Sequence, residues 1–414
     1  MNVRVDLETF RALLTTEGQA LLTVLQDVEP GLEHVTLADL RRERPAALVS
    51  AAVEQVRLRR RAAAKFGEFA PRLYFTPDSV ELSSHLAVSQ YKLSRVLDEL
   101  GVVLIDAMSL GSGVDALVLS WSHMTEAVDK DPLTIEITAA NRQAMDEPML
   151  QLNCADITGF DSQGEAVFID LMRRVGPGEG HDPEAYDPPL SWALDRVRTT
   201  GAGWIRLAPG LPDEAVPDLG RADEAEWISY DGEIQEVVLW FGLLGRRTAL
   251  PTPVRKATLL PCGVSLAGRG LPEPAVRPVG RYLYEPDPAV VHARLVAEVA
   301  QDVSGGLVDE GGPLITADEL HRTPFATAYE ITDVLPFKSA ALRATLRERA
   351  VGRVAVTAPG LGIALDEFRR ELAPKEPGAA TVFITGTTDR PTVLIASPIL
   401  DTPTPRNGTA FAGS

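Results

Sequence analysis

The spacing of apolar residues divides the chain into a helical first part and an alternating second part. Residues 1 to about 100 carry apolar positions at helical spacing, with helices predicted within 7–26, over 45–65 and over about 80–97. From 102 to about 261, short apolar runs alternate with amphipathic stretches, which is the pattern of an α/β sheet. The predicted strands are Val102–Asp106, Thr125–Asp129, Leu150–Cys154, Ala166–Asp170, Gly203–Leu207, Trp227–Tyr230, Gln235–Phe241 and Lys256–Leu260.

The end of the alternating region changes character. Asp231-Gly232 is a strong turn dipeptide, and the apolar runs beside it predict a hairpin over 226–241. Helices are predicted between the earlier strands, for example over 134–145 and 190–198. The sheet is therefore expected to begin with parallel strands and to end with antiparallel ones.

The last third of the chain has shorter elements. Residues 271–278 are rich in proline and predict a linker. One or two small α+β units are expected beyond it, with helices over 287–303, 336–349 and 365–372 and strands over 351–357, 380–386 and 392–396. The predicted domains are a helical region (1–100), an α/β domain (101–262), a first small unit (278–335), a second (336–400) and a disordered tail (401–414).

Composition narrows the class of protein. The 414 residues are 45% hydrophobic and 24% charged, which is ordinary for a globular chain of two or three domains. No run of 18 apolar residues supports a membrane span, and the first ten residues lack the apolar segment of a signal peptide. A cytoplasmic protein is expected. Cys154 and Cys262 lie outside any metal-ligand spacing and are predicted to be buried small hydrophobes, and no histidines show paired spacing for a metal.

The charge balance bears on partners. A net charge of −18 argues against indiscriminate nucleic-acid binding, and nothing in the sequence points to DNA. A local basic patch is compatible with this negative net charge. The most basic segment, within 57–65, has two interpretations that the sequence leaves open: a solvated helix face, which we favour, or a contact for RNA or another polyanion. Oligomeric state is not indicated.

Aspartates follow the early predicted strands. Asp106 and the turn 109–113 follow the first strand, and Asp129, Asp156 and Asp170 follow the second, third and fourth. Open α/β sheets bind ligands at the carboxyl ends of their strands. Glycine lets a backbone approach a ligand closely, while carboxylates accept hydrogen bonds from ribose hydroxyls or an adenine amine. One such aspartate is ordinary helix capping, but four in register favour a nucleoside-type ligand.

A family resemblance covers nearly the whole chain. The matching segments are LRRRAAAKF (58–66), GVDAL (113–117), VDKDP (128–132), IDLMRR (169–174), DPEAYDPPLSWAL (182–194), LAPGLP (207–212), EWISYDGEIQEVVLWFG (226–242), GRYLYEPDPAVVHARLV (280–296) and TPFATAYEITDVLPF (323–337). Together with the hairpin-ended sheet, they resemble class I S-adenosylmethionine-dependent methyltransferases, and more narrowly a bacterial, actinobacterial-type family that joins such a domain to a THUMP-like domain.

The resemblance implies a fold and a set of roles. It implies an α/β, Rossmann-like class I methyltransferase sheet, a helical N-terminal region and a ferredoxin-like and THUMP-like α+β part. S-adenosylmethionine would be the cofactor, bound by Asp106, Gly111, Gly113, Asp129 and Asp156. A second set, comprising Asp170, Arg173 and Arg174, would orient the substrate. RNA is the implied partner, because THUMP domains are associated with RNA modification.

The chain also departs from the family pattern at three places. The first motif has Ser109 in place of a glycine, with its acid displaced to Asp106. Leu171 replaces a proline after the fourth strand, and Thr357-Ala358-Pro359 replaces three cations. The segment Asp187-Pro188-Pro189-Leu190 resembles an amino-methyltransferase motif but lacks its aromatic residue, so it is interpreted as a helix start.

These observations support one leading hypothesis and two alternatives. The leading hypothesis is an S-adenosylmethionine-dependent methyltransferase homologue acting on RNA. The alternative is a catalytically inactive protein of the same fold that serves as an RNA- or protein-binding scaffold, which the three departures favour. A nicotinamide-dependent oxidoreductase is disfavoured, because the turn at 109–113 lacks a full Gly-x-Gly-x-x-Gly pattern.

Overall fold

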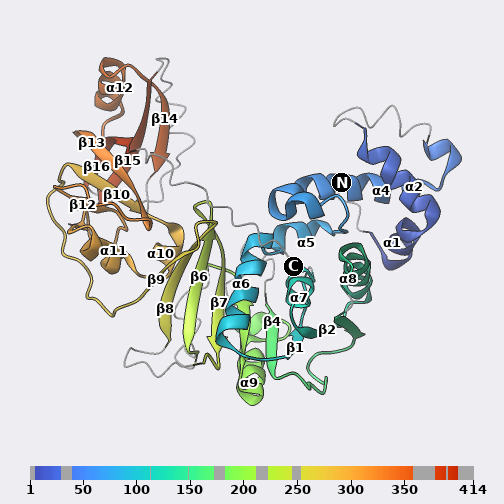
Figure 1. The fold of residues 1–414 in the computed structure, drawn as a ribbon. Helices are drawn as coiled ribbons and strands as arrows, with labels where there is room; N and C mark the ends of the chain where they lie inside the picture. Colours follow the sequence, from blue (N-terminus) through green and yellow to red (C-terminus); the bar gives the residue numbers. More distant parts are fainter. Residues whose placement is uncertain are drawn as a thin grey trace, which may run out of the picture. The chain divides into compact units, whose positions relative to one another are not determined.

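The chain forms two compact units, residues 1–265 and 266–414. The computed structural model describes residues 5–28, 40–111, 113–147, 149–171, 182–210, 222–244, 253–357, 378–387 and 390–399. Each unit is treated by itself below, with the elements labelled in Figure 1.

A nine-stranded sheet organises the described part of the first unit. Its order is β3-β2-β1-β4-β5-β7-β6-β8-β9. Strands β1 to β5 are parallel to one another, whereas β7 runs antiparallel to both β5 and β6. The strands are β1 (Leu104–Met108), β2 (Met124–Asp129), β3 (Leu150–Cys154), β4 (Ala166–Asp170), β5 (Gly203–Leu207), β6 (Glu224–Tyr230), β7 (Glu233–Phe241), β8 (Val254–Leu260) and β9 (Val264–Ala267). The predicted parallel sheet with an antiparallel hairpin is confirmed.

The first strand is shifted relative to its prediction. The sequence predicted a strand over 102–106, whereas β1 ends two residues later, at Met108. Asp106 therefore lies inside the strand and not after it. Side chains inside a strand point alternately to the two faces of the sheet. The Asp106 side chain therefore points to one face and does not lie at the end of the strand.

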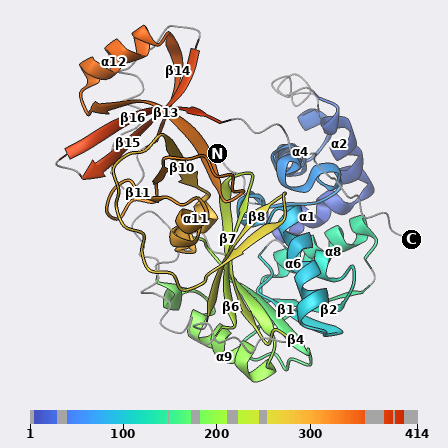
Figure 2. The same ribbon diagram turned by 60° about the vertical axis from the view of Figure 1, so that its left-hand side comes forward.

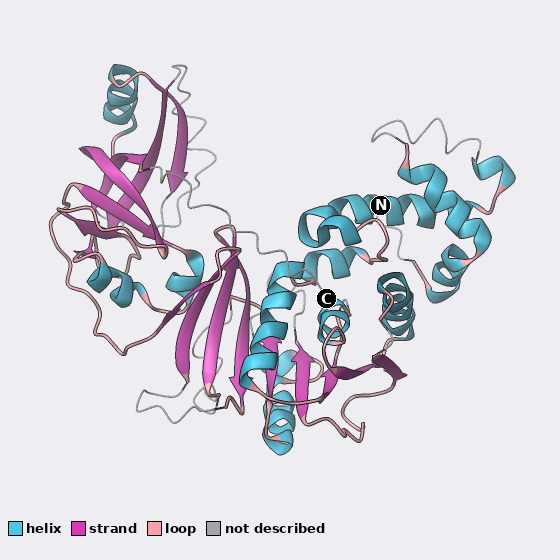
Figure 3. Ribbon diagram, in the orientation of Figure 1, coloured by secondary structure: helices cyan, strands magenta, loops and turns pink. Residues whose placement is uncertain are grey.

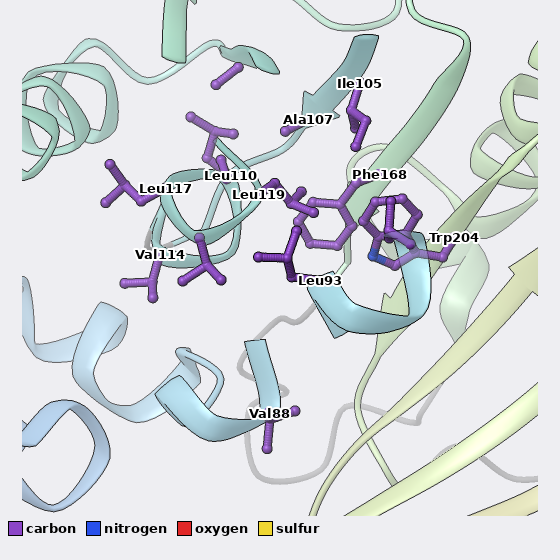
Figure 4. Close-up of a cluster of buried hydrophobic side chains, with 14 of the residues drawn as sticks. Val88, Leu93, Ile105, Ala107, Leu110, Val114, Leu117, Leu119, Phe168 and Trp204 are labelled. Atoms are coloured by element: carbon purple, nitrogen blue, oxygen red, sulfur yellow. The ribbon is translucent and has the colours of Figure 1, made fainter. Parts of the chain in front are cut away.

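Helices cover both faces of this sheet. They are α5 (Pro77–Leu82), α6 (Leu86–Glu99), α7 (Val114–Leu119), α8 (Pro132–Met145) and α9 (Leu190–Thr200), with short 3₁₀ turns η1 (Gly67–Phe69) and η2 (Pro183–Ala185). Helix α8 begins where the Asp131 carboxylate accepts the Leu133 and Thr134 amides and Pro132 occupies the first turn. Figure 4 shows side chains of α6, α7, β1, β4 and β5 meeting in one hydrophobic core.

The N-terminal helices share a core with the α/β elements. These helices, shown in Figure 3, include α1 (Leu7–Leu14), α2 (Thr16–Gln26) and α4 (Ala46–Phe66). Buried side chains of α1, α2 and the first half of α4 form one cluster with Ile137 and Ala140 of α8. The Asn141 side chain, fully buried, also pairs with the backbone N–H and C=O of Tyr74. Residues 1–100, predicted as a domain, thus pack within the same compact unit as the sheet.

A seven-stranded sheet forms the second unit in its described part. Its order is β11-β12-β10-β13-β16-β15-β14. Figure 2 shows β13, β16 and β15 side by side. The strands are β10 (Tyr282–Pro286), β11 (Gly306–Leu307), β12 (Ile315–Ala317), β13 (Ala326–Pro336), β14 (Val351–Thr357), β15 (Gly378–Thr387) and β16 (Arg390–Pro398). The helices are α10 (Pro288–His292), α11 (Val296–Asp302) and α12 (Ser339–Glu348). The predicted boundary at 335/336 falls at the end of β13, and β13 pairs with strands from both sides of it.

Several smaller predictions concern residues outside the described ranges, and one is corrected. The helix predicted over 365–372, the tail 401–414 and the replaced cations at 358–359 lie outside the described residues. The prediction that both cysteines are buried is wrong, since Cys154 and Cys262 are exposed free thiols. Within the described ranges, no helix is long and apolar enough to cross a membrane, and no group of three or more His, Cys, Asp or Glu residues could hold a metal ion.

Gly113 offers a test of the packing between α7 and α8. It has φ +74°, and a Cβ there would lie 2.3 Å from the Thr138 hydroxyl oxygen. Gly232 has a similar φ of +79° in open space. We expect Gly232→Ala to lower the free energy of unfolding by about 1 kcal/mol through backbone strain, and Gly113→Ala by about 2–4 kcal/mol through strain and overpacking, measured by urea denaturation. Equal losses in the two variants would contradict this packing.

Candidate functional site

The carboxyl ends of β1, β2 and β3 surround a pocket. Its described lining is Ser109, Gly111, Asp129, Lys130, Asp131, Thr134, Asp156, Ile157, Thr158, Asp187 and Pro188. The pocket volume is about 160 Å³. Pockets for drug-sized ligands typically measure about 300–1,000 Å³, so the space that the described residues enclose is smaller than such a site. Ser112 and residues 172–181 lie outside the described residues.

Asp129 holds the turns around the pocket. One carboxylate oxygen accepts the Leu110 amide at 2.9 Å, and the other accepts the Asp131 amide at 2.8 Å. A carboxylate can accept several hydrogen bonds, and Asp129 lines the pocket. Asp129 therefore both shapes the 109–111 turn and presents acceptors to the pocket.

The 109–111 turn approaches the pocket in a left-handed conformation. Ser109 has φ +58° and Gly111 has φ +57°. Glycine adopts such a φ readily, whereas a serine there is strained by about 1–3 kcal/mol. Ser109 nevertheless adopts this left-handed conformation, and it lines the pocket.

The third strand contributes Asp156. Its carboxylate accepts both the hydroxyl and the amide of Thr158, at 2.7 and 2.9 Å. Hydrogen bonds from the Thr158 side chain and backbone lower the pKa of Asp156, so this exposed group is ionised at neutral pH. With Asp129, Asp131 and Asp187 also present, the pocket is acidic, and Lys130 is ion-paired to Asp187.

Asp187 was assigned a different role by sequence. The predicted helix does begin at Leu190, but its N-cap is Pro189, and Asp187 instead lines the pocket and pairs with Lys130. The Asp-Pro-Pro resemblance was the signal for this placement. Interpreting these residues only as a helix start left out the position of Asp187 in the pocket lining.

The remaining predicted site residues lie elsewhere. Gly113 is absent from the described lining of the pocket. A larger residue at this position would clash with the Thr138 side chain. Asp106 is fully buried inside β1 and accepts the Ser162 hydroxyl and the Gly164 amide, away from the pocket. Its other carboxylate oxygen has no hydrogen-bond partner among the described residues. This corrects the expectation that Asp106 joins the strand-end acids.

The predicted substrate-orienting residues have a mixed outcome. Asp170 is 4% exposed and forms a 3.0 Å ion pair with Arg206 of β5, so its charge is already paired within the protein. Arg173 and Arg174 lie outside the described residues. Arg206 was not singled out by sequence, although an arginine inside the apolar strand Gly203–Leu207 was an available signal.

The sheet order and its strand-end pocket define a class I methyltransferase fold. A solved structure of a Porphyromonas gingivalis W83 protein, described by name as a methyltransferase, superposes with a TM-score of 0.71. The match covers 96% of this chain and 100% of that chain at 16% sequence identity. At that identity, the likeness concerns the fold.

Sequence relatives and domain families agree with this class. Two Mycobacterium tuberculosis proteins, from strains CDC 1551 / Oshkosh and H37Rv, are each 29% identical over 340 residues, covering 80% of this chain and 91% of theirs. Each is named an uncharacterized S-adenosylmethionine-dependent methyltransferase. Residues 326–398 match the THUMP domain-like family, and residues 6–62 match a domain of unknown function. The resemblance drawn from the sequence is confirmed: the chain is a homologue of these proteins and carries a THUMP-like domain.

The contrast between two predicted acids can be tested by their effects on stability. We expect Asp106→Ala to lower the free energy of unfolding by about 1–3 kcal/mol, because it leaves the half-buried Gly164 amide without its acceptor. Asp156→Ala removes an exposed acid and should leave the urea midpoint nearly unchanged. A larger loss in the Asp156 variant would contradict these positions.

Proposed function

We propose that this protein binds S-adenosylmethionine in the pocket at the ends of β1, β2 and β3. The observation that carries the proposal is the convergence of Gly111, Asp129 and Asp156 on one pocket. In this assignment, Asp129 accepts hydrogen bonds from the ribose hydroxyls, and Asp156 accepts one from the adenine amine. Gly111 lets the backbone pass close to the ligand.

The electrostatics of the pocket support this cofactor over a dinucleotide. S-adenosylmethionine carries a sulfonium and an ammonium cation, which a cluster of carboxylates attracts. A pyrophosphate would face four acids, with Lys130 already paired to Asp187. The residues present therefore fit a cationic nucleoside better than an anionic one.

The chain's part in methyl transfer would be mainly one of positioning. When bound, the cofactor would supply an activated methyl group, and holding it against a nucleophile converts an encounter into an oriented reaction. Asp129 and the 109–111 turn would fix the orientation of the nucleoside. Arg173 and Arg174 stay proposed substrate contacts on the family resemblance, whereas Asp170 is buried in an ion pair.

We further propose RNA as the partner of the second unit. The match of residues 326–398 to the THUMP domain-like family supports this. On α12, Leu342 and Leu346 are buried, whereas Arg343 and Arg347, four residues apart, are exposed on its outer side. In a chain of net charge −18, this is a local site for phosphate contacts.

A scaffold without methyl transfer is the second candidate. The observation that favours it is the burial of Asp170. Its carboxylate pairs with Arg206 and is not available to bind the group that would accept the methyl. Radiolabelled methyl transfer to total bacterial RNA separates the two candidates. Incorporation above that of heat-denatured protein supports the enzyme, and binding without incorporation supports the scaffold.

The cofactor proposal is tested by calorimetry with S-adenosylhomocysteine. We expect Asp129→Ala to weaken binding by about 10- to 100-fold, because hydrogen bonds to a charged group contribute about 1.5–3 kcal/mol. Glu165→Ala is the matched control: Glu165 also accepts two backbone amides, but at the amino ends of the strands. Unchanged affinity in the Asp129 variant, or an equal loss in both, would refute the assignment.

The RNA proposal is tested by the salt dependence of binding to a single-stranded RNA. We expect the double variant Arg343→Ala/Arg347→Ala to bind more weakly and to lower the slope of log K against log salt by about 0.7 for each lost phosphate contact. Arg281→Ala, which removes an exposed arginine paired with Glu330 in the same unit, should keep the slope. If the double variant has the same slope as the unaltered protein, α12 is excluded as the RNA contact.

A further inference from the structure

A layer of buried charges lies beneath helix α6, at the carboxyl ends of β4 and β5. Phe168, Trp204 and Trp240 stack across β4, β5 and β7, with ring centroids 5.2 and 5.5 Å apart. Two residues further along the strands, Asp170 lies directly opposite Arg206 in the β4–β5 register. The aromatic row is thus followed by an ionic row on the same face, toward the pocket end of the sheet.

Five residues form what is called here the inner cluster. They are Lys92 of α6, Asp115 of α7, Asp170 of β4, Arg206 of β5 and Glu236 of β7. All are at most 8% exposed. Lys92 bridges Asp115 and Glu236 at 2.9 and 2.7 Å, and Arg206 bridges Glu236 and Asp170 at 2.6 and 3.0 Å. The charges form one continuous chain from helix α6 to the end of β4.

Arg206 uses its whole guanidinium group in this chain. Its Nε donates to Glu236, one terminal nitrogen donates to Asp170, and the other donates to the Leu82 carbonyl at 2.7 Å. Such a fork fixes the direction of each partner, which a lysine with one nitrogen cannot reproduce. The Asp170 carboxylate is therefore held in one orientation.

Asp170 lies directly behind the pocket turn. A Cβ added to Gly111 would sit 2.9 Å from the Asp170 Oδ2 atom, the same oxygen that Arg206 holds. On another side, the Asp129 carboxylate holds the Leu110 amide. The turn is thus confined between two carboxylates, of which Asp129 lines the pocket and Asp170 is buried.

We propose that Arg206 is a positioning residue for the pocket turn: through Asp170, it fixes the backbone at Gly111 in the conformation that receives the nucleoside. Asp170 then acts as a wall behind the turn, and its carboxylate does not contact the ligand. The inference rests on the proposed function for the identity of the ligand. Its structural half, the placement of the turn by Arg206, does not depend on that identity.

A second buried cluster provides a matched control. Arg95 of α6 pairs with Glu224 and Glu226 of β6, and it lies 4.4 Å from the Trp240 ring centroid. Arg95 is 3% exposed, against 2% for Arg206. Arg206 pairs with two acids, and Arg95 pairs with Glu99 of its own helix in addition to its two β6 acids. Among the described residues, the ion-pair partners of Arg95 are Glu99, Glu224 and Glu226, none of which belongs to the turn. An identical substitution at both arginines therefore separates general stability from positioning.

The first experiment compares Arg206→Lys with Arg95→Lys in the full chain. Both keep the charge and lose the fork, so we expect both to lower the urea midpoint. Calorimetry with S-adenosylhomocysteine should show at least tenfold weaker binding for Arg206→Lys and less than twofold change for Arg95→Lys. Equal affinities in the two folded variants would overturn the proposal. If Arg206→Lys does not fold, Asp170→Asn replaces it, with the same expected loss.

The second experiment tests the contact between Asp170 and Gly111. Gly111→Ala should weaken binding strongly in the unaltered chain, and much less in an Asp170→Ala background, because the oxygen that the new methyl group would meet is gone. Additive effects of the two substitutions would overturn the role of Asp170. A residual loss in the double variant is expected from the positive φ of Gly111.

Hydrogen exchange separates failure of the inference from failure of the proposed function. Amides of the turn, Leu110 and Gly113, donate to Asp129 and to the Leu110 carbonyl. We expect at least tenfold faster exchange of these amides in Arg206→Lys and no change in Arg95→Lys, without any ligand present. If the unaltered protein binds no S-adenosylhomocysteine, the proposed function fails, while this exchange still decides the placement of the turn.

Discussion

Helix α6 carries two cations into the interior of the α/β unit, and their pairing determines how the helix and the sheet fit together. Lys92 and Arg95 are 2% and 3% exposed. An unpaired buried charge costs several kcal/mol, so the helix can dock only where acids receive both side chains. Besides Glu99 of α6 itself, those acids come from α7 and from β6 and β7, which are distant in sequence from α6. The pairing therefore specifies one arrangement of these elements.

The acids are kept ionised by the same contacts. Burial would raise the pKa of Glu226, but Arg95 and Lys256 lower it to about 2. Burial would likewise raise the pKa of Asp115 and Glu236, and the nearby Lys92 and Arg206 lower it on balance. Within each of the two buried clusters, every charge depends on its partners, and the inner cluster extends as far as the back of the pocket turn at Gly111.

The acids at the strand ends have two different roles: some line the pocket, and one forms a buried ion pair. Asp129 and Asp156 are accessible in the pocket, whereas Asp170 is paired to Arg206. A protein that binds a cationic nucleoside benefits from accessible carboxylates, and a turn of fixed shape loses less conformational entropy on binding. The departures from the family pattern at Ser109 and Leu171 lie beside this arrangement, and Ser109 adopts the left-handed conformation that the turn needs.

The sequence alone did not predict strands β9 to β13. It did predict strands β1 to β8, the hairpin at Asp231-Gly232 and three residues that line the pocket, Gly111, Asp129 and Asp156. It could do so because hydrophobic periodicity and turn chemistry are local. Only the tertiary structure decided that Asp106 lies inside β1, because a two-residue shift of a strand end is invisible to periodicity. It also decided that Asp170 pairs with Arg206 and that α6 supplies buried cations. Polar residues such as Glu224, Glu226 and Glu236 look solvent-exposed in sequence, and their burial depends on partners brought together only by folding.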